Sequence, residues 1–171
     1  YDETRRQLNR LVDELQALLG AQYQATTEAL KPDMIQRFLK SEQAVVRGVG
    51  ARIIYDDAIN GVTTPSPVVR QLLRGMIGDS DAKVRLEVAR TIRATNDPEA
   101  LAALLQQLVI EPQADVRVAI VQAVQSIADA GAIPILIERL NDPSDRVVEA
   151  VADALGAIGQ TLRERDRATY E

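Results

Sequence analysis

Apolar residues recur along this chain with a helical period, and one pattern of them appears four times. Three clear copies are 81–95 (DAKVRLEVARTIRAT), 113–127 (QADVRVAIVQAVQSI) and 143–158 (PSDRVVEAVADALGAI), and a fainter one is 42–54 (EQAVVRGVGARII). They align on Val46, Val84, Val116 and Val147, which are 38, 32 and 31 residues apart. A period of about 30 to 45 residues made of paired helices is typical of a helical solenoid.

Each copy predicts a helix, called B here, with one apolar face. Positions are counted from the aligned valine, which is position 0. Positions 4 and 8 are apolar in the clear copies, as in Val88 and Ile92. Position 5 is always small and falls on Ala51, Ala89, Val121 and Ala152. We expect neighbouring B helices to approach each other at this small residue.

A second apolar segment precedes each B helix and predicts a partner helix, called A. These segments are 33–39, 68–77, 101–110 and 133–140. The seven prolines all lie at expected helix starts or turns, where a missing N–H costs little. The pattern predicts an all-α, right-handed α-solenoid of about four helix pairs, because neither helix of a pair can bury its stripe alone. The expected array covers 28–160, with pairs at about 28–60, 65–95, 98–129 and 132–159.

Two segments lie outside the repeat. Residues 2–19 form an amphipathic helix with Leu8, Leu11, Leu15 and Leu18 on one side. We expect the region 1–27 to cap the apolar end of the array. Self-association through these four leucines, as a coiled coil or connector, stays open as an alternative. Residues 161–171 are highly charged and are expected to form a solvated tail.

Composition argues against catalysis. The 171 residues are 46% hydrophobic, with no Trp, no Cys and no His. The absence of Cys leaves no disulfide or thiolate chemistry, and His is the side chain most used for acid–base catalysis and metal binding. No glycine-rich phosphate loop is present either. We therefore predict a protein that is not an enzyme, with no catalytic residue, metal or cofactor.

Charge and termini limit the partners. The net charge of −5 disfavours a general nucleic-acid binder, although a nucleic-acid-binding solenoid stays open as a second alternative. No apolar run reaches the roughly 18 residues needed to span a bilayer, and no signal peptide is visible. Because the chain begins with Tyr1 rather than Met, we expect a module of a longer protein. The compartment stays open, with the cytoplasm favoured.

The stretches DSDAKVRLEVARTI, EPQADVRVAIVQAV and NDPSDRVVEAVADALGAIG resemble HEAT repeats, in particular their short bacterial subtype, the PBS-lyase-like repeats. The last stretch departs from the pattern at Val148, where Arg is usual. The resemblance implies a protein-binding scaffold whose B helices line a concave surface. It also implies that an arginine at position 1 pairs with an acidic residue of the adjacent repeat. These arginines are Arg47, Arg85 and Arg117.

A candidate binding face follows from positions 2, 6 and 9 of the B helices, which share one stripe. They read Gly48, Arg52, Tyr55, then Leu86, Arg90, Arg93, then Val118, Gln122, Gln125, and finally Glu149, Asp153, Gly156. The stripe changes from basic to acidic along the array, which would orient an extended protein or peptide partner. We predict that Arg52, Tyr55, Arg90 and Arg93 meet an acidic part of that partner, and that Glu149 and Asp153 meet a basic part. Charged exposed helix faces are common, so chance is the competing explanation.

Overall fold

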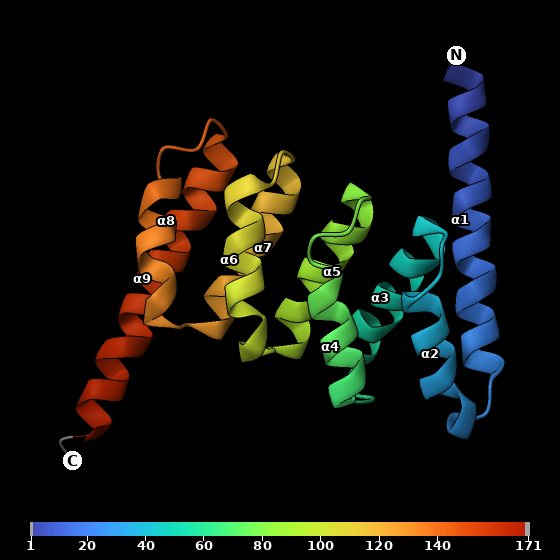
Figure 1. The fold of residues 1–171 in the computed structure, drawn as a ribbon, viewed down its shortest axis with the longest axis horizontal. Coiled ribbons are helices and arrows are strands. Elements are labelled where there is room, and N and C mark those ends of the chain that lie inside the picture. Colours follow the sequence, from blue (N-terminus) through green and yellow to red (C-terminus); the bar gives the residue numbers. More distant parts are fainter. Residues whose placement is uncertain (1, 170–171) are drawn as a thin grey trace.

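The computed structural model describes residues 2–169, and its helices stack in sequence order (Figure 1). The α-helices are α1 (Asp2–Ala25), α2 (Lys31–Leu39), α3 (Ala44–Ile59), α4 (Pro67–Gly75), α5 (Ala82–Thr95), α6 (Leu101–Ile110), α7 (Ala114–Ile127), α8 (Ile133–Arg139) and α9 (Asp145–Thr169). Short 3-10 turns at 28–30, 98–100 and 130–132 precede α2, α6 and α8. The predicted all-α solenoid is confirmed. No helix within residues 2–169 has the length and apolarity to cross a membrane.

The helices form two layers. The A layer consists of α2, α4, α6 and α8, and the B layer consists of α3, α5, α7 and α9. Each B helix packs extensively against the next B helix, whereas successive A helices touch each other little. Helix α1 lies against α3, on the side opposite α5 (Figure 1). The B helices are thus the continuous spine of the array.

The core follows the predicted positions. Val84, Val88 and Ile92, at positions 0, 4 and 8 of α5, are at most 1% exposed. The small residue at position 5 lies where two B helices meet: the Thr91 hydroxyl contacts the Ala51 carbonyl oxygen at 2.9 Å. Ala89 and Val121 are buried in the same way. Ala152 is exposed instead, because no B helix follows α9 within the described residues.

Local signals explain where α5 begins and where α5 and α7 end. The Asp81 carboxylate accepts from the backbone N–H groups of Lys83 and Val84 and so caps the start of α5. At the other end, α5 stops at Asn96 and α7 stops at Ala128, with left-handed φ values of 45° and 54°. Both residues are at position 12. A left-handed residue is a common way to terminate a helix.

Helix α9 departs from this plan. Gly159 occupies position 12, yet the helix continues through it to Thr169. The charged tail expected from residue 161 is therefore helical as far as the structure describes it. The sequence after Gly159 lacks the Asp that caps the 3-10 turns after α5 and α7. It offers helix-supporting contacts instead, such as that between Gln160 and Glu164 at 3.0 Å.

Candidate functional site

The stripe at positions 2, 6 and 9 lies on the surface of the B layer, and we call it the B face. Its members on α3, α5, α7 and α9 are half-buried or exposed, and none is buried. Arg93 on α5 donates through Nη1 to Oε1 of Gln122 on α7, at 3.1 Å. This bond joins position 9 of one repeat to position 6 of the next. The stripe is therefore continuous between these two helices.

Two of the three arginines of the B face, Arg52 and Arg90, have acidic neighbours on their own helices. Arg52 lies 3.3 Å from Asp56, and its guanidinium carbon is 5.9 Å from the centre of the Tyr55 ring. Arg90 lies 3.3 Å from Glu87. These ion pairs are long and partly exposed, and such pairs contribute little to stability. A partner carboxylate can therefore displace them at small cost.

A groove of about 870 Å³ opens at the N-terminal end of this face. Helix α3 contributes its floor, which consists of the small or apolar Ala44, Val45, Gly48, Val49 and Ile53 together with the charged Arg52 and Asp56. Helices α1 and α5, which contact opposite sides of α3, form the walls. The wall residues are Asn9, Val12, Asp13, Gln16 and Gly20 from α1, with Lys83, Val84, Leu86 and Glu87 from α5. The groove therefore has a largely apolar floor between walls that combine charged, polar and apolar side chains.

The electrostatics of the groove differ from the basic end that the stripe predicts. Arg52 and Lys83 line it together with four carboxylates, Asp13, Asp56, Asp81 and Glu87. The stripe alone could not reveal this excess of acid, because Asp13 belongs to α1 and the other three occupy positions outside 2, 6 and 9. The basic character begins at Arg90 and Arg93, which do not line the groove.

The remaining residues of the predicted site lie farther along the B layer. Gln122 and Gln125 are half-buried on α7, and Glu149 and Asp153 are exposed on α9. None of these four lines the groove. The structure thus separates the predicted site into a groove at α1–α3–α5 and an open surface over α5, α7 and α9.

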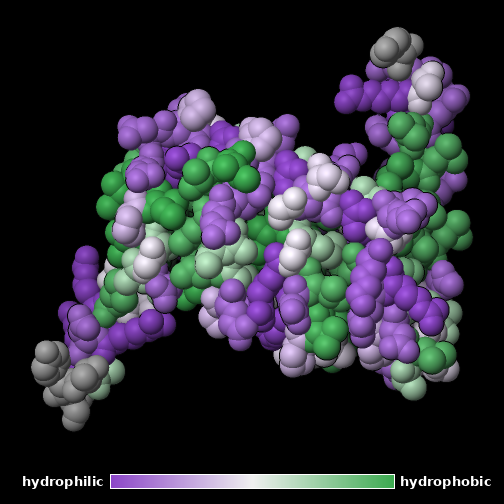
Figure 2. Space-filling model, in the orientation of Figure 1, coloured by the Kyte–Doolittle hydropathy of each residue, from purple (hydrophilic) through white to green (hydrophobic). Residues whose placement is uncertain are grey.

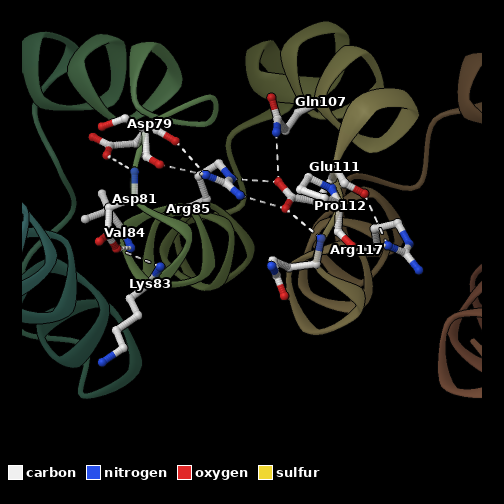
Figure 3. A network of polar contacts seen from close by, with 11 residues as sticks. Asp79, Asp81, Lys83, Val84, Arg85, Gln107, Glu111, Pro112 and Arg117 are labelled. Carbon is white, nitrogen blue, oxygen red and sulfur yellow. Dashed lines mark hydrogen bonds and ion pairs between the residues drawn. The ribbon is translucent and has the colours of Figure 1, made fainter. Parts of the chain in front are cut away.

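The arginines at position 1 form a second polar system, located at the A–B turns (Figure 3). Nε and Nη2 of Arg85 each bind one oxygen of Glu111 in the next repeat, at 2.7 and 2.8 Å. Arg47 binds Asp79 and Arg117 binds Asp142 in the same bidentate geometry, with all four hydrogen bonds at 2.8 Å. Each arginine also donates through Nη1 to backbone carbonyl oxygens of its own turn. We call these three pairs the turn ladder.

The turn ladder controls the ionisation of its acids. Burial opposes the charge on Glu111, but hydrogen bonds from Arg85, Gln107 and the Gln113 backbone N–H outweigh it, and the pKa of Glu111 is lowered. The same balance, with Arg47 and Arg117 as partners, lowers the pKa values of Asp79 and Asp142. Each carboxylate also accepts a backbone N–H of its turn. These side chains are engaged in holding repeats together.

The repeat pattern in the sequence did not predict two further contacts. The Tyr23 hydroxyl donates to Asp57 at 2.9 Å and so fixes α1 to α3. Burial and this hydrogen bond raise the pKa of the Tyr23 phenol. Arg74 on α4 binds both Asp97, at 2.6 Å, and Glu99, at 2.5 Å. Neither contact recurs from repeat to repeat, so the alignment of copies carried no signal for it.

Comparisons with known proteins agree with this architecture. A model of HEAT repeats matches residues 102–168, without specifying the PBS-lyase-like subtype. Among solved structures, the crystal structure of an engineered protein is similar, with a TM-score of 0.62 and 20% sequence identity. The similarity covers 92% of this chain and 74% of the engineered one, and it shows a shared fold. The comparison with curated proteins gives no match.

Proposed function

We propose that the chain is a non-catalytic scaffold that binds a helical segment of a protein partner on its B face, because residues 102–168 match a model of HEAT repeats. HEAT repeats generally mediate protein–protein interactions. The groove over α3 supports the proposal most directly. A largely apolar floor between walls that carry both charged and apolar side chains accepts the apolar face of an amphipathic helix.

Charge gives the bound segment its direction. Basic side chains of the partner meet the carboxylates Asp13, Asp56 and Glu87 at the groove. A following acidic stretch contacts Arg90 and Arg93, with Arg52 and Tyr55 at the boundary between the two. Gln122 and Gln125 lie under the next part of the partner. A second basic stretch reaches Glu149 and Asp153.

A protein segment fits these surfaces better than nucleic acid does. A phosphate backbone needs a run of cations, whereas the groove presents four carboxylates against two cations. Arg52 and Arg90 also each lie beside a carboxylate. The observation that favours a helix is the floor, where Gly48 leaves room above α3. A Cβ built at Gly48 meets only Val84 Cγ2, at 4.0 Å.

Peptide selection tests the proposal. Helical peptides are selected from a displayed library against the wild-type chain and then titrated against variants. Gly48→Phe fills the groove, and the double variant R90E/R93E reverses the charge beside it. We expect each to weaken the selected peptides at least about tenfold, which is about 1.4 kcal/mol.

The matched control is R37E/K40E, an equal double charge reversal at two exposed positions at the end of the A helix α2. It should leave peptide affinity unchanged. Circular dichroism checks that all variants keep their helical content. If the selected peptides bind both B-face variants as tightly as the wild type, the B face is not the binding surface.

A further inference from the structure

The outer side of α1 is apolar and uncovered. Its leucines Leu8, Leu11, Leu15 and Leu18 are 59%, 63%, 39% and 68% exposed. Tyr23 is the buried residue of this helix. Figure 2 shows hydrophobic surface along the part of α1 that projects past the rest of the array. Capping of α3 by α1 therefore leaves the leucines of α1 without a cover.

The position of α1 in the fold explains this exposure. It lies beside α3, in line with the B layer, but contacts α3 less extensively than each B helix contacts the next one. Aligning Gly20 with the small position 5 places Leu15 at position 0 and Leu18 at position 3. In α7, Val116 at position 0 and Ala119 at position 3 are buried, at 2% and 4% exposure. Leu15 and Leu18 of α1 thus lie at positions that are buried in α7, where a B helix precedes.

The opposite end of the array carries a second apolar surface. On α9, positions 1, 5, 8 and 12 are Val148, Ala152, Leu155 and Gly159, and all are half-buried or exposed. In α5 and α7, the residues at positions 5 and 8 are buried against the next B helix. Within the described residues, these positions of α9 therefore leave small and apolar side chains without a covering helix.

The glycines of α9 add to the argument. A Cβ built at Gly156 or Gly159 meets nothing within 4 Å, so no contact within the chain requires glycine there. Glycine is also a poor helix former. Together with Ala152, these residues leave a shallow surface on α9 against which another helix can lie closely. Leu155 and the half-buried Leu162 supply apolar surface beside it.

We propose that the leucine side of α1 in a second copy of this chain docks on the outer side of α9, so that copies associate head to tail. The docked helix takes the place of the next B helix, and its leucines lie over Ala152, Gly156 and Gly159. The contact continues the B-to-B packing that is already the most extensive contact in the array. Pairing of α1 with α1 would cover the leucines but leave α9 bare. Head-to-tail contact covers both surfaces at once.

Because the two surfaces differ, the contact does not close on itself in a dimer. A heterologous contact generates rings or open chains of copies. Average mass should therefore rise with concentration and pass the mass of a dimer. This property separates the proposal from a two-fold pairing of α1 helices.

Sedimentation of the full chain from micromolar to millimolar concentration tests it. The double variant L11E/L18E disables the α1 surface, and A152E/G156E disables the α9 surface. All four sites are half-buried or exposed, so the fold should persist, which circular dichroism checks. Each double variant alone should stay monomeric. An equimolar mixture should give a one-to-one dimer and nothing larger, because one intact surface of each kind remains.

Leu30→Glu is the matched control, since Leu30 is 58% exposed but lies outside the leucine stripe of α1. This variant should associate as the wild type does. A wild-type chain that is monomeric at the highest concentration overturns the proposal. So does an A152E/G156E variant that still dimerises while L11E/L18E does not, since that result shows pairing of α1 with α1.

Discussion

The A–B turns inside the array and the helices α1 and α9 at its two ends differ in how their side chains are covered. At the turns, Arg85 and Glu111 are almost fully buried and use their polar atoms on one another and on the backbone. At the ends, α1 and α9 leave apolar side chains in solvent. The turns therefore fix how repeats stack, whereas the ends remain able to take a further helix. Stability should depend on the first region and association on the second.

Acid should produce the largest change, because it acts on all three pairs of the turn ladder together. The pKa values of Asp79, Glu111 and Asp142 are lowered in the folded chain. Their ion pairs therefore contribute stability that is fully present above about pH 4, the ordinary range of carboxyl groups. This contribution is lost as the pH falls through the lower folded values. Urea midpoints measured between pH 7 and pH 2 should fall steeply below about pH 4.

Asp115→Asn is the control for this profile. Asp115 pairs with Arg146 at 2.7 Å between neighbouring repeats, but both side chains are more than 60% exposed. Its removal should leave the pH profile unchanged. A urea midpoint that stays level down to pH 2 in the wild type would show that the turn ladder does not stabilise the fold through its charges.

Removal of one member of the ladder should come next in size. Glu111→Ala leaves the Arg85 guanidinium buried without its partner, at a cost of about 3–5 kcal/mol. Urea unfolding followed by circular dichroism measures it. The exposed counterpart Arg146→Ala should cost less than about 1 kcal/mol. The double variant R85M/E111L should recover much of the loss, since an apolar pair of similar size needs no charge partner. Equal losses for Glu111→Ala and Arg146→Ala would contradict this account.

The repeated parts of the molecule were predictable from sequence, whereas the contacts and placement of the unrepeated parts were not. Positions that are apolar in all copies of the pattern stand out from those that vary. The alignment on Val84 and Val116 therefore predicted the B helices and the positions of their core. The groove depends on where α1 lies, and the bond between Tyr23 and Asp57 helps to fix that position. A single contact of this kind has no periodicity. The continuation of α9 through Gly159 also escaped prediction, because the same position ends α5 and α7.

Two glycines on one helix give a smaller, internal test of packing inside the array. A Cβ at Gly50 would lie 2.9 Å from Phe38 Cβ and 3.2 Å from the Leu39 backbone nitrogen, so Gly50→Ala forces α3 away from α2. We expect a loss of about 1–3 kcal/mol, the usual cost of overpacking. At Gly48 the nearest atom is 4.0 Å away, so Gly48→Ala should stabilise α3 by about 0.5–1 kcal/mol. Urea unfolding gives both values, and equal signs would contradict the close approach of α2 and α3.

The smallest expected effect belongs to the end of the array, where its sign carries the information. Gly159 aligns with Asn96 and Ala128, whose left-handed backbone ends α5 and α7. If α9 continues through Gly159 as a helix, Gly159→Ala stabilises the chain by up to about 1 kcal/mol, because alanine is the better helix former and meets no atom within 4 Å. If α9 ended there in a left-handed turn, the same change would destabilise it. Asn96→Gly is the matched comparison, since glycine favours a left-handed helix end and should stabilise that position. Opposite residue preferences at two aligned positions, measured by urea unfolding, would show that α9 departs from the repeat to extend past the array.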